Sequence, residues 1–284
     1  MRTLALRDGM TVPAVGLGTW RMGESARSRS AEVAAVRQAI ELGYRLFDTA
    51  EMYGEGGAEE VLGQALADAM RAGDVTRDEL FVVSKVYPHN ASRKGTQGAC
   101  ERSLARLQLD HVDLYLLHWR GTHALEETVA GFERLRAQDK LRAWGVSNLD
   151  TRDMAELWRA PQGTQCVANQ VYYSLSERGV EFDLVPWQRQ HGVATMAYCP
   201  IDQGTIARSA ALKPLAERLN ATPAQIALAW LVSRGDVIAI PKAVQAAHLQ
   251  ENLAAADVVL DEAALAELDR LFPPPGKKQP LAMT

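Results

Sequence analysis

The stretch "VDLYLLHW" at residues 112–119 is a nearly continuous apolar run that ends in a polar side chain, His118. A short run of this kind is typical of a parallel strand buried on both faces, whereas a half-exposed antiparallel strand alternates apolar and polar residues. Seven further runs are rich in β-branched and aromatic residues, and most of them contain consecutive apolar residues. The chain therefore has eight candidate strands, at residues 15–20, 44–49, 80–86, 112–119, 142–148, 166–173, 193–200 and 237–243.

Helical patterns lie between these runs. Val33, Val36 and Ile40 share one helical face, and "TPAQIALAWLV" from residue 222 begins with Thr222 as N-cap and Gln225 as its capping-box partner. Strand and helix alternate without a linker or a low-complexity tract. This pattern favours one closed (β/α)₈ TIM barrel, an α/β fold, over two doubly wound domains. We therefore predict a single barrel domain over residues 1–284.

The two ends of the chain depart from the alternation. The opening "LALRDGMTV" at residues 4–12 reads as a β-hairpin around Asp8-Gly9. At the other end, a helix from residue 261 runs into "PPPGKKQPLAMT" after Phe272, where the prolines prevent helix continuation. We predict an N-terminal hairpin and a short, extended C-terminal tail.

Composition narrows the functional class. The chain is 47% hydrophobic and 23% charged with a net charge of -4, so it has no basic surplus for a nucleic acid or a membrane surface. No apolar stretch approaches the roughly 18 residues that a membrane span requires. Cys100, Cys166 and Cys199 are far apart, and we expect free, buried thiols in a reducing cytoplasm. The expected partner is a small molecule, and the expected state is a monomer or weak oligomer.

The common nucleotide and metal motifs are missing. "GLGTWR" from Gly16 has Arg21 where the dinucleotide fingerprint requires its third glycine, and "GEGGAE" from Gly54 has Glu59 there. The six histidines do not form an HExxH motif, so we expect no metal. A nucleotide that binds this chain would not bind through a Rossmann turn.

Polar side chains close most of the candidate strands. In a TIM barrel the active site lies at the carboxyl ends of the strands, so these side chains would share one mouth. Taken singly, His118 fits a satisfied core histidine, and Lys85 fits a lysine that reaches solvent. Because Asp and Lys are almost never buried unpaired, Asp48 and Lys85 on adjacent strands are plausible ion-pair partners. The residues at the strand ends are Asp48, Lys85, His118, Asn148, Gln170, Tyr198 and Lys242.

A tyrosine follows the second strand closely in "RLFDTAEMYG" at residues 45–54. Its loop position would bring the Tyr53 hydroxyl beside the Lys85 ammonium, and a nearby cation lowers a phenol pKa from its usual value of about 10. Tyr53 would then be a general acid, with Asp48 holding the lysine and His118 donating to a substrate oxygen. Such a site suits carbonyl reduction, in which hydride reaches carbon and a proton reaches oxygen. The alternative is that Tyr53 is only a loop aromatic.

At these residues the sequence resembles the aldo-keto reductase family, over essentially the whole chain. The motifs that carry the resemblance keep the family's order and spacing: "GLGTW", "DTAEMYG", "SKV", "LHW", "GVSN", "NQVYY", "AYCP" and "IPKA". The resemblance implies an NADP(H)-dependent barrel enzyme with Asp48, Tyr53, Lys85 and His118 as the catalytic tetrad. Bacterial members that look like this chain reduce small aldehydes such as methylglyoxal, and some reduce keto-acid esters or sugars.

The resemblance also implies binding roles. Ser147, Asn148 and Gln170 would hold the nicotinamide carboxamide, and the Tyr198 ring would stack on the nicotinamide. The other implied cofactor contacts are Thr19, Ile201, Gln203, Lys242, His248 and Asn252. The implied substrate pocket consists of Trp20, Tyr87 and Trp119, although composition alone would place the tryptophans in the core.

The eighth strand departs from the family pattern. Members that prefer NADP carry a lysine, a serine or threonine beside it, and an arginine six residues after the lysine, all serving the adenosine 2′-phosphate. This chain has Lys242, Ala243 and His248. Histidine cannot make the forked contact of a guanidinium and is mostly neutral at pH 7. We still expect a preference for NADPH over NADH, because Lys242 retains one fixed cation.

Two short segments suggest a shallow, open mouth. The loop "RGTHA" from Arg120 and the tail after Phe272 are both shorter than the segments that fold over the pocket in longer members. No charged cluster in the loops indicates a phosphorylated or anionic substrate, although Arg21 and Arg120, each next to a pocket tryptophan, could attract one. Two alternatives stay open: a weakly catalytic nicotinamide-binding module that reports redox state, and an enzyme that works as an alcohol dehydrogenase in the cell.

Overall fold

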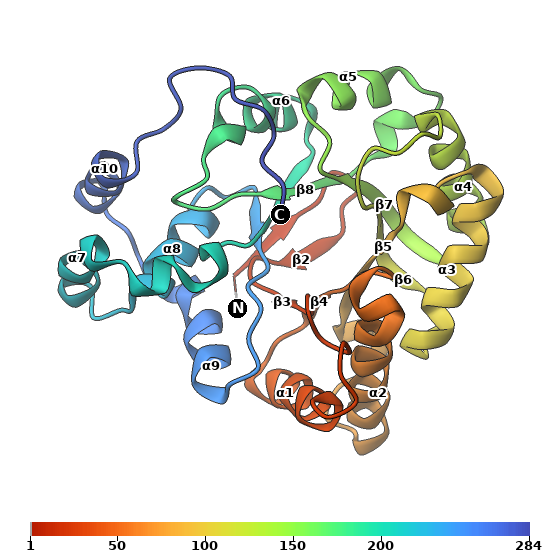
Figure 1. Cartoon of the computed structure of the whole chain (residues 1–284), viewed down its shortest axis with the longest axis horizontal. Helices are drawn as coiled ribbons and strands as arrows, with labels where there is room; N and C mark the ends of the chain where they lie inside the picture. Colours follow the sequence, from red (N-terminus) through yellow and green to blue (C-terminus); the bar gives the residue numbers. More distant parts are fainter. Residues whose placement is uncertain (1) are drawn as a thin grey trace.

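The computed structural model describes residues 2–284, and its centre is one sheet of eight parallel strands. Neighbouring strands in the chain are neighbours in the sheet, and they run from β3 to β10 (Figure 1). Its two edges meet where Val15 forms a parallel bridge with Ala239 and Gly18 N donates to the Pro241 carbonyl at 3.0 Å. The predicted eight-stranded barrel is therefore confirmed. Its strands are β3 (Leu17–Gly18), β4 (Leu46–Asp48), β5 (Phe81–Val86), β6 (Val112–Leu117), β7 (Leu141–Ser147), β8 (Ala168–Tyr172), β9 (Ala194–Tyr198) and β10 (Val237–Ala239).

Helices surround the sheet and follow the predicted alternation (Figure 1). At the start of α8, Thr222 Oγ1 accepts from Gln225 N and Gln225 Oε1 accepts from Thr222 N, so the predicted capping box forms. Helix α1 buries Val36 and Ile40, two of the three apolar residues that indicated its inner face. The helices are α1 (Arg29–Leu42), α2 (Gly57–Ala72), α3 (Arg93–Leu107), α4 (Leu125–Ala137), α5 (Thr151–Arg159), α6 (Leu184–His191), α7 (Lys213–Arg218), α8 (Pro223–Val232), α9 (Ala246–Ala254) and α10 (Glu262–Leu271).

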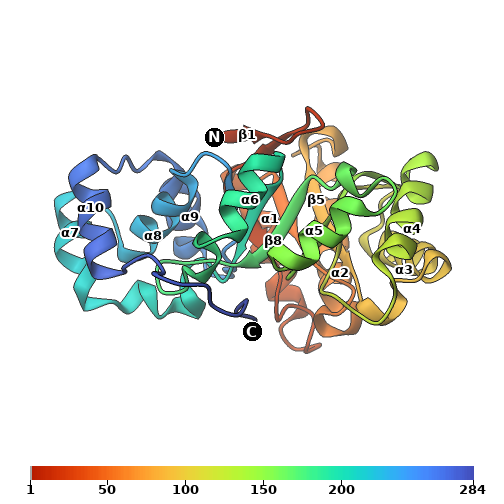
Figure 2. The ribbon, with the colours of Figure 1, turned by 90° about the horizontal axis from the view of Figure 1, so that it is seen from above.

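The predicted hairpin covers one end of the barrel. Strands β1 (Thr3–Ala5) and β2 (Thr11–Pro13) pair antiparallel, with Gly9 in a left-handed conformation in the turn. Leu6 and Val12 belong to the same buried apolar cluster as the side chains inside the barrel. Figure 2 shows the hairpin on the face opposite to the C-terminus. The barrel is therefore closed at the amino ends of its strands, which leaves the carboxyl ends for a site.

The tail after α10 is extended, as expected, but it does not leave the mouth open. Arg178, buried in the loop after β8, donates to Asp269 and to the Phe272 carbonyl and so fixes the point where the tail begins. Further on, Lys278 pairs with Asp150 at 2.5 Å and with Asp183 at 2.8 Å. The last residues then reach the centre of the barrel's open face (Figure 1). The expectation of an uncovered mouth is wrong, because these ion pairs direct the short tail across it.

The cysteines are largely as expected, and so is the character of the helices. The three cysteines are free, and Cys100 and Cys166 are buried as expected. Cys199 is only half-buried, because it lies on the wall of a cavity. Within residues 2–284, none of the helices has the length and apolar character needed to cross a membrane.

We predict that Arg178→Ala destabilises the fold by about 3 kcal/mol, because it removes a buried guanidinium together with its hydrogen bonds to Glu181, Asp269 and the Phe272 carbonyl. Only 5% of the Arg178 side chain is exposed, and its guanidinium also lies 4.9 Å from the Trp230 ring. Urea denaturation measures the change. Arg189→Ala is the matched control: it removes an exposed pair with Asp236 and should cost less than about 1 kcal/mol. Equal losses in the two variants would contradict this role of Arg178.

Candidate active site

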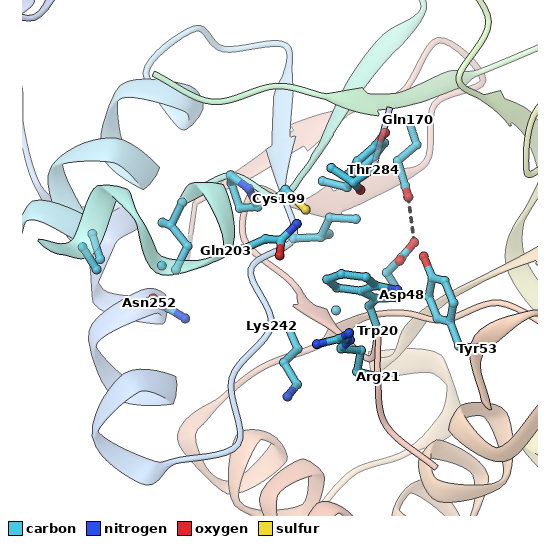
Figure 3. Close-up of a pocket in the computed structure, with 18 of the residues that line it drawn as sticks. Trp20, Arg21, Asp48, Tyr53, Gln170, Cys199, Gln203, Lys242, Asn252 and Thr284 are labelled. Atoms are coloured by element: carbon cyan, nitrogen blue, oxygen red, sulfur yellow. Dashed lines mark hydrogen bonds between the residues drawn. The ribbon is translucent and has the colours of Figure 1, made fainter. Parts of the chain in front are cut away.

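A buried ion pair lies at the carboxyl ends of β4 and β5. Lys85 Nζ donates to Asp48 Oδ2 at 2.7 Å and to the Thr49 carbonyl at 2.8 Å. The other Asp48 oxygen accepts from Gln170 Nε2 at 2.7 Å (Figure 3). Burial lowers the pKa of Lys85, and the Asp48 carboxylate opposes that shift. The adjacent strands thus form the ion pair that the sequence suggested, and Lys85 does not reach solvent.

Tyr53 stands beside this pair, in the loop after β4. Its hydroxyl lies 3.4 Å from Lys85 Nζ, and its ring meets the His118 ring edge-on at 5.6 Å. Burial raises the phenol pKa well above 10, and the Asp48 charge raises it further. The expectation that Lys85 lowers this pKa is wrong for this structure, because Asp48 offsets the ammonium and burial penalises the phenolate. Both effects favour the protonated phenol of Tyr53 at neutral pH.

His118 lines the same cavity and is not a satisfied core histidine. Its Nδ1 atom is buried and has no hydrogen-bond partner among residues 2–284. Burial, and then the Lys85 charge, lower the His118 pKa well below 6.5. The imidazole is consequently neutral at pH 7 and has one N–H to donate.

The ends of β7, β8 and β9 form a second polar group. Asn148 has a left-handed backbone (φ 56°), a conformation that asparagine tolerates better than most residues. Its Nδ2 donates to the His118 carbonyl at 3.2 Å, and its Oδ1 accepts from the Tyr198 hydroxyl at 3.0 Å. Ser147 Oγ donates to the Gln170 carbonyl at 2.9 Å. The side chains of Ser147, Asn148 and Gln170 are thus held in fixed positions close to the Asp48–Lys85 pair.

One cavity of about 990 Å³ joins these groups, near the upper end of the range for cofactor sites. Thr19, Lys85 and Tyr87 lie outside its lining. Thr19 Oγ1 donates to the Asp48 carbonyl at 3.0 Å, and Tyr87 packs edge-on against Trp119 at 5.2 Å. The other site residues predicted from the sequence all line the cavity: Trp20, Asp48, Tyr53, His118, Trp119, Ser147, Asn148, Gln170, Tyr198, Ile201, Gln203, Lys242, His248 and Asn252.

The cavity also has cationic groups on its wall. Arg21 and Lys242 line it (Figure 3), and so does Arg208. Among residues 2–284 none of the three forms an ion pair with a carboxylate. Arg21 lies over the Trp20 ring at 5.1 Å. Arg120 is different: it pairs with Asp153 and Glu156 and does not line the cavity. The expectation that Arg120 attracts a substrate is therefore wrong, because two helix carboxylates already hold it.

Sequence reasoning missed several lining residues. Cys199 and Arg208 come from the segment after β9, whose path a pattern of apolar residues does not define. The N-terminus of α8 reaches the cavity at residues 222–224; its capping box was visible in the sequence, but its place beside the cavity was not. Met283 and Thr284 reach the cavity through the tail. Lys278 was a possible signal in the sequence that the tail is anchored, but its acidic partners Asp150 and Asp183 are distant in sequence.

The fold and site define a class: a (β/α)₈ barrel with one cavity that extends from a carboxylate, a phenol and an imidazole to cationic side chains, with a buried lysine paired to the carboxylate. The model of the aldo/keto reductase family matches residues 14–272. The chain belongs to this family. It is 51% identical over 279 residues to methylglyoxal reductase YeaE of Escherichia coli (strain K12), a match that covers 96% of each chain.

One further relative and one solved structure are consistent with this family. The chain is 32% identical over 269 residues to glyoxal reductase of Bacillus subtilis (strain 168), covering 95% of this chain and 92% of the relative. The crystal structure of an aldo/keto reductase from Klebsiella pneumoniae, in complex with NADP and acetate, superposes with a TM-score of 0.92. That structure is 49% identical and covers 99% of each chain.

The lowered His118 pKa predicts a pH dependence of stability. Below about pH 6.5 the histidine binds a proton in the unfolded chain but not in the folded one. The free energy of unfolding therefore decreases as the pH is lowered, by up to about 1.4 kcal/mol per pH unit. His118→Gln should lose less stability than wild type between pH 7 and pH 5. Urea denaturation at both pH values measures this difference. Equal losses in both proteins would contradict a buried, neutral His118.

Proposed function

We propose that this protein reduces small aldehydes and ketones to alcohols with NADPH, and that Tyr53 is the general acid. The observation that carries the proposal is the Tyr53 hydroxyl, which lies 3.4 Å from Lys85 Nζ in a cavity that His118 also lines. Burial raises the pKa of this phenol, which favours the protonated form. The names of the relatives, a methylglyoxal reductase and a glyoxal reductase, support small dicarbonyl compounds as substrates.

The cavity fits a nicotinamide dinucleotide phosphate. Ser147, Asn148 and Gln170 present polar groups for a carboxamide, and the Tyr198 ring lines the cavity beside them. The cations Arg21 and Lys242 suit phosphate groups, because charge-assisted hydrogen bonds to phosphate are strong. When bound, NADPH supplies the hydride that reaches the carbonyl carbon. The neighbour solved with NADP supports this cofactor.

The chain's own residues supply and stabilise the proton. The high pKa of Tyr53 keeps its proton in place until negative charge develops on the substrate oxygen, which then takes it. The Lys85 ammonium stabilises the phenolate that results, and Asp48 with Gln170 keeps the lysine in position. Neutral His118 donates a second hydrogen bond to the same oxygen. General acid catalysis of this kind contributes roughly 10² to 10⁴ fold.

The pocket walls favour small substrates. Trp20 and Trp119 line the same cavity as Tyr53 and His118. Met283 and Thr284 of the C-terminal tail also line it. Arg21, over the Trp20 ring, is a cation that would also attract a substrate carboxylate where it does not contact a cofactor phosphate. Methylglyoxal-like and aromatic aldehydes fit this description best. Keto-acid esters and sugars are further candidates, and the direction in the cell depends on the cofactor ratio.

Tyr53→Phe should lower turnover of methylglyoxal by roughly 10² to 10⁴ fold and leave NADPH affinity nearly unchanged, because only the proton donor is lost. The loss of NADPH absorbance measures turnover, and cofactor fluorescence measures binding. A variant that keeps a third of the wild-type rate would exclude Tyr53 as general acid. A wild-type protein that binds NADPH tightly and reduces no member of a panel of aldehydes, keto-acids and aldoses would instead favour the redox-reporting module.

His248→Arg should tighten NADPH binding several-fold and leave NADH binding unchanged, because a guanidinium makes the forked contact with a 2′-phosphate that histidine lacks. His248 and Lys242 line the same cavity. Fluorescence titration with each cofactor measures the effect, and His248→Gln is the uncharged control. An equal gain for both cofactors would contradict a role for His248 at the 2′-phosphate.

A further inference from the structure

The segment after β9, residues 199–204, has an unusual backbone. Cys199, Asp202 and Gln203 all have positive φ angles, of 48°, 49° and 50°. Residues other than glycine adopt this conformation at a cost of about 1 kcal/mol or more each, and they persist when surrounding contacts hold them. Within the segment, Asp202 N donates to the Cys199 carbonyl and Gly204 N donates to the Ile201 carbonyl, each at 2.9 Å. We call residues 199–204 the β9 loop.

The β9 loop turns one acidic side chain away from the cavity. Ile201, Gln203 and Gly204 line the cavity, but Asp202 between them does not. The Asp202 carboxylate instead accepts a hydrogen bond from the Tyr172 hydroxyl. Among residues 2–284, no lysine or arginine forms an ion pair with Asp202. The phenol of Tyr172 is thus the side-chain partner that sets the direction of this carboxylate.

Tyr172 also supports the aromatic ring on the cavity wall. It ends β8 directly opposite Tyr198 in the parallel register of β8 and β9. The two rings stack with centroids 5.6 Å apart and an angle of 21° between their planes. Tyr198 lines the cavity and Tyr172 does not, so Tyr172 backs Tyr198 from outside.

We propose that Tyr172 is a positioning residue for NADP(H): its hydroxyl holds the Asp202 carboxylate out of the cavity, and its ring supports Tyr198. This rests on the proposed NADPH-dependent function. The cavity bears the cations Arg21, Arg208 and Lys242, and a carboxylate turned toward them would compete with the cofactor's phosphates. The hydroxyl therefore contributes to cofactor affinity without touching the cofactor.

Tyr172→Phe keeps the stacked ring and removes only the hydroxyl. We expect the dissociation constant for NADPH to rise about tenfold, since hydrogen bonds to charged groups are among the stronger ones. The single-turnover rate at saturating NADPH should stay close to that of wild type, because Tyr172 is not in contact with the reacting groups. Fluorescence titration measures the first quantity and stopped-flow oxidation of NADPH the second.

Tyr173→Phe is the matched control. The adjacent Tyr173 also donates to a carboxylate, Glu181 at 2.7 Å, but it lies in the buried core. Its variant should lose a similar hydrogen bond and bind NADPH like wild type. An equal loss of NADPH affinity in both phenylalanine variants would reduce Tyr172 to a structural role and overturn the proposal.

Removing the charge of Asp202 supplies a rescue test. Asp202→Asn keeps a hydrogen-bond acceptor, and asparagine tolerates the left-handed backbone. In this background, Tyr172→Phe should cost much less NADPH affinity than it does in wild type, because no carboxylate remains at this position to turn inward. A loss of about tenfold that persists in the Asp202→Asn background would overturn the proposed role of the carboxylate.

The outcomes also separate this proposal from the proposed function. A wild-type protein that binds NADPH but reduces no substrate would overturn the proposed reductase function. The effect of Tyr172→Phe on NADPH affinity would still test the role of Tyr172. Unchanged NADPH binding in Tyr172→Phe, with turnover intact, would overturn only the role of Tyr172.

Discussion

The site depends on one buried ion pair, Lys85 with Asp48. Two charges removed from water carry a desolvation cost of several kcal/mol each, and only close geometry with further hydrogen bonds offsets it. Here the Thr49 carbonyl and the Gln170 amide complete the partners, so three strands are fixed relative to one another. The same burial and the same charges keep Tyr53 protonated and His118 neutral. Stability and the proposed chemistry therefore have a common origin.

The barrel separates the polar chemistry from the structural core. The hairpin closes the amino ends of the strands, and the apolar cluster inside the barrel fills the space between the hairpin and the site. The carboxyl ends carry the amides, the phenol and the imidazole, and the cavity extends from them to cationic side chains. A long ligand with a neutral polar head and anionic groups matches this distribution, as a nicotinamide dinucleotide does.

Segments outside the barrel strands shape the mouth. Arg178 fixes the end of α10, and Lys278 joins the tail to two acidic residues at the starts of α5 and α6. The β9 loop adopts its left-handed backbone against β8. These contacts pair residues that are distant in sequence, so the shape of the mouth depends on the tertiary structure.

The sequence by itself determined the eight strands, the hairpin, the capping box of α8 and the polar residues at the strand ends, because each depends on local periodicity or on position within one strand. It also indicated the Asp48–Lys85 pair, since charged residues are rarely buried alone. Only the tertiary structure decided the direction of the Tyr53 pKa, the engagement of Arg120 with helix carboxylates, and the covering of the mouth by the tail. The physical reason is that burial and long-range electrostatics depend on which distant groups surround a side chain, and a linear pattern does not record that environment.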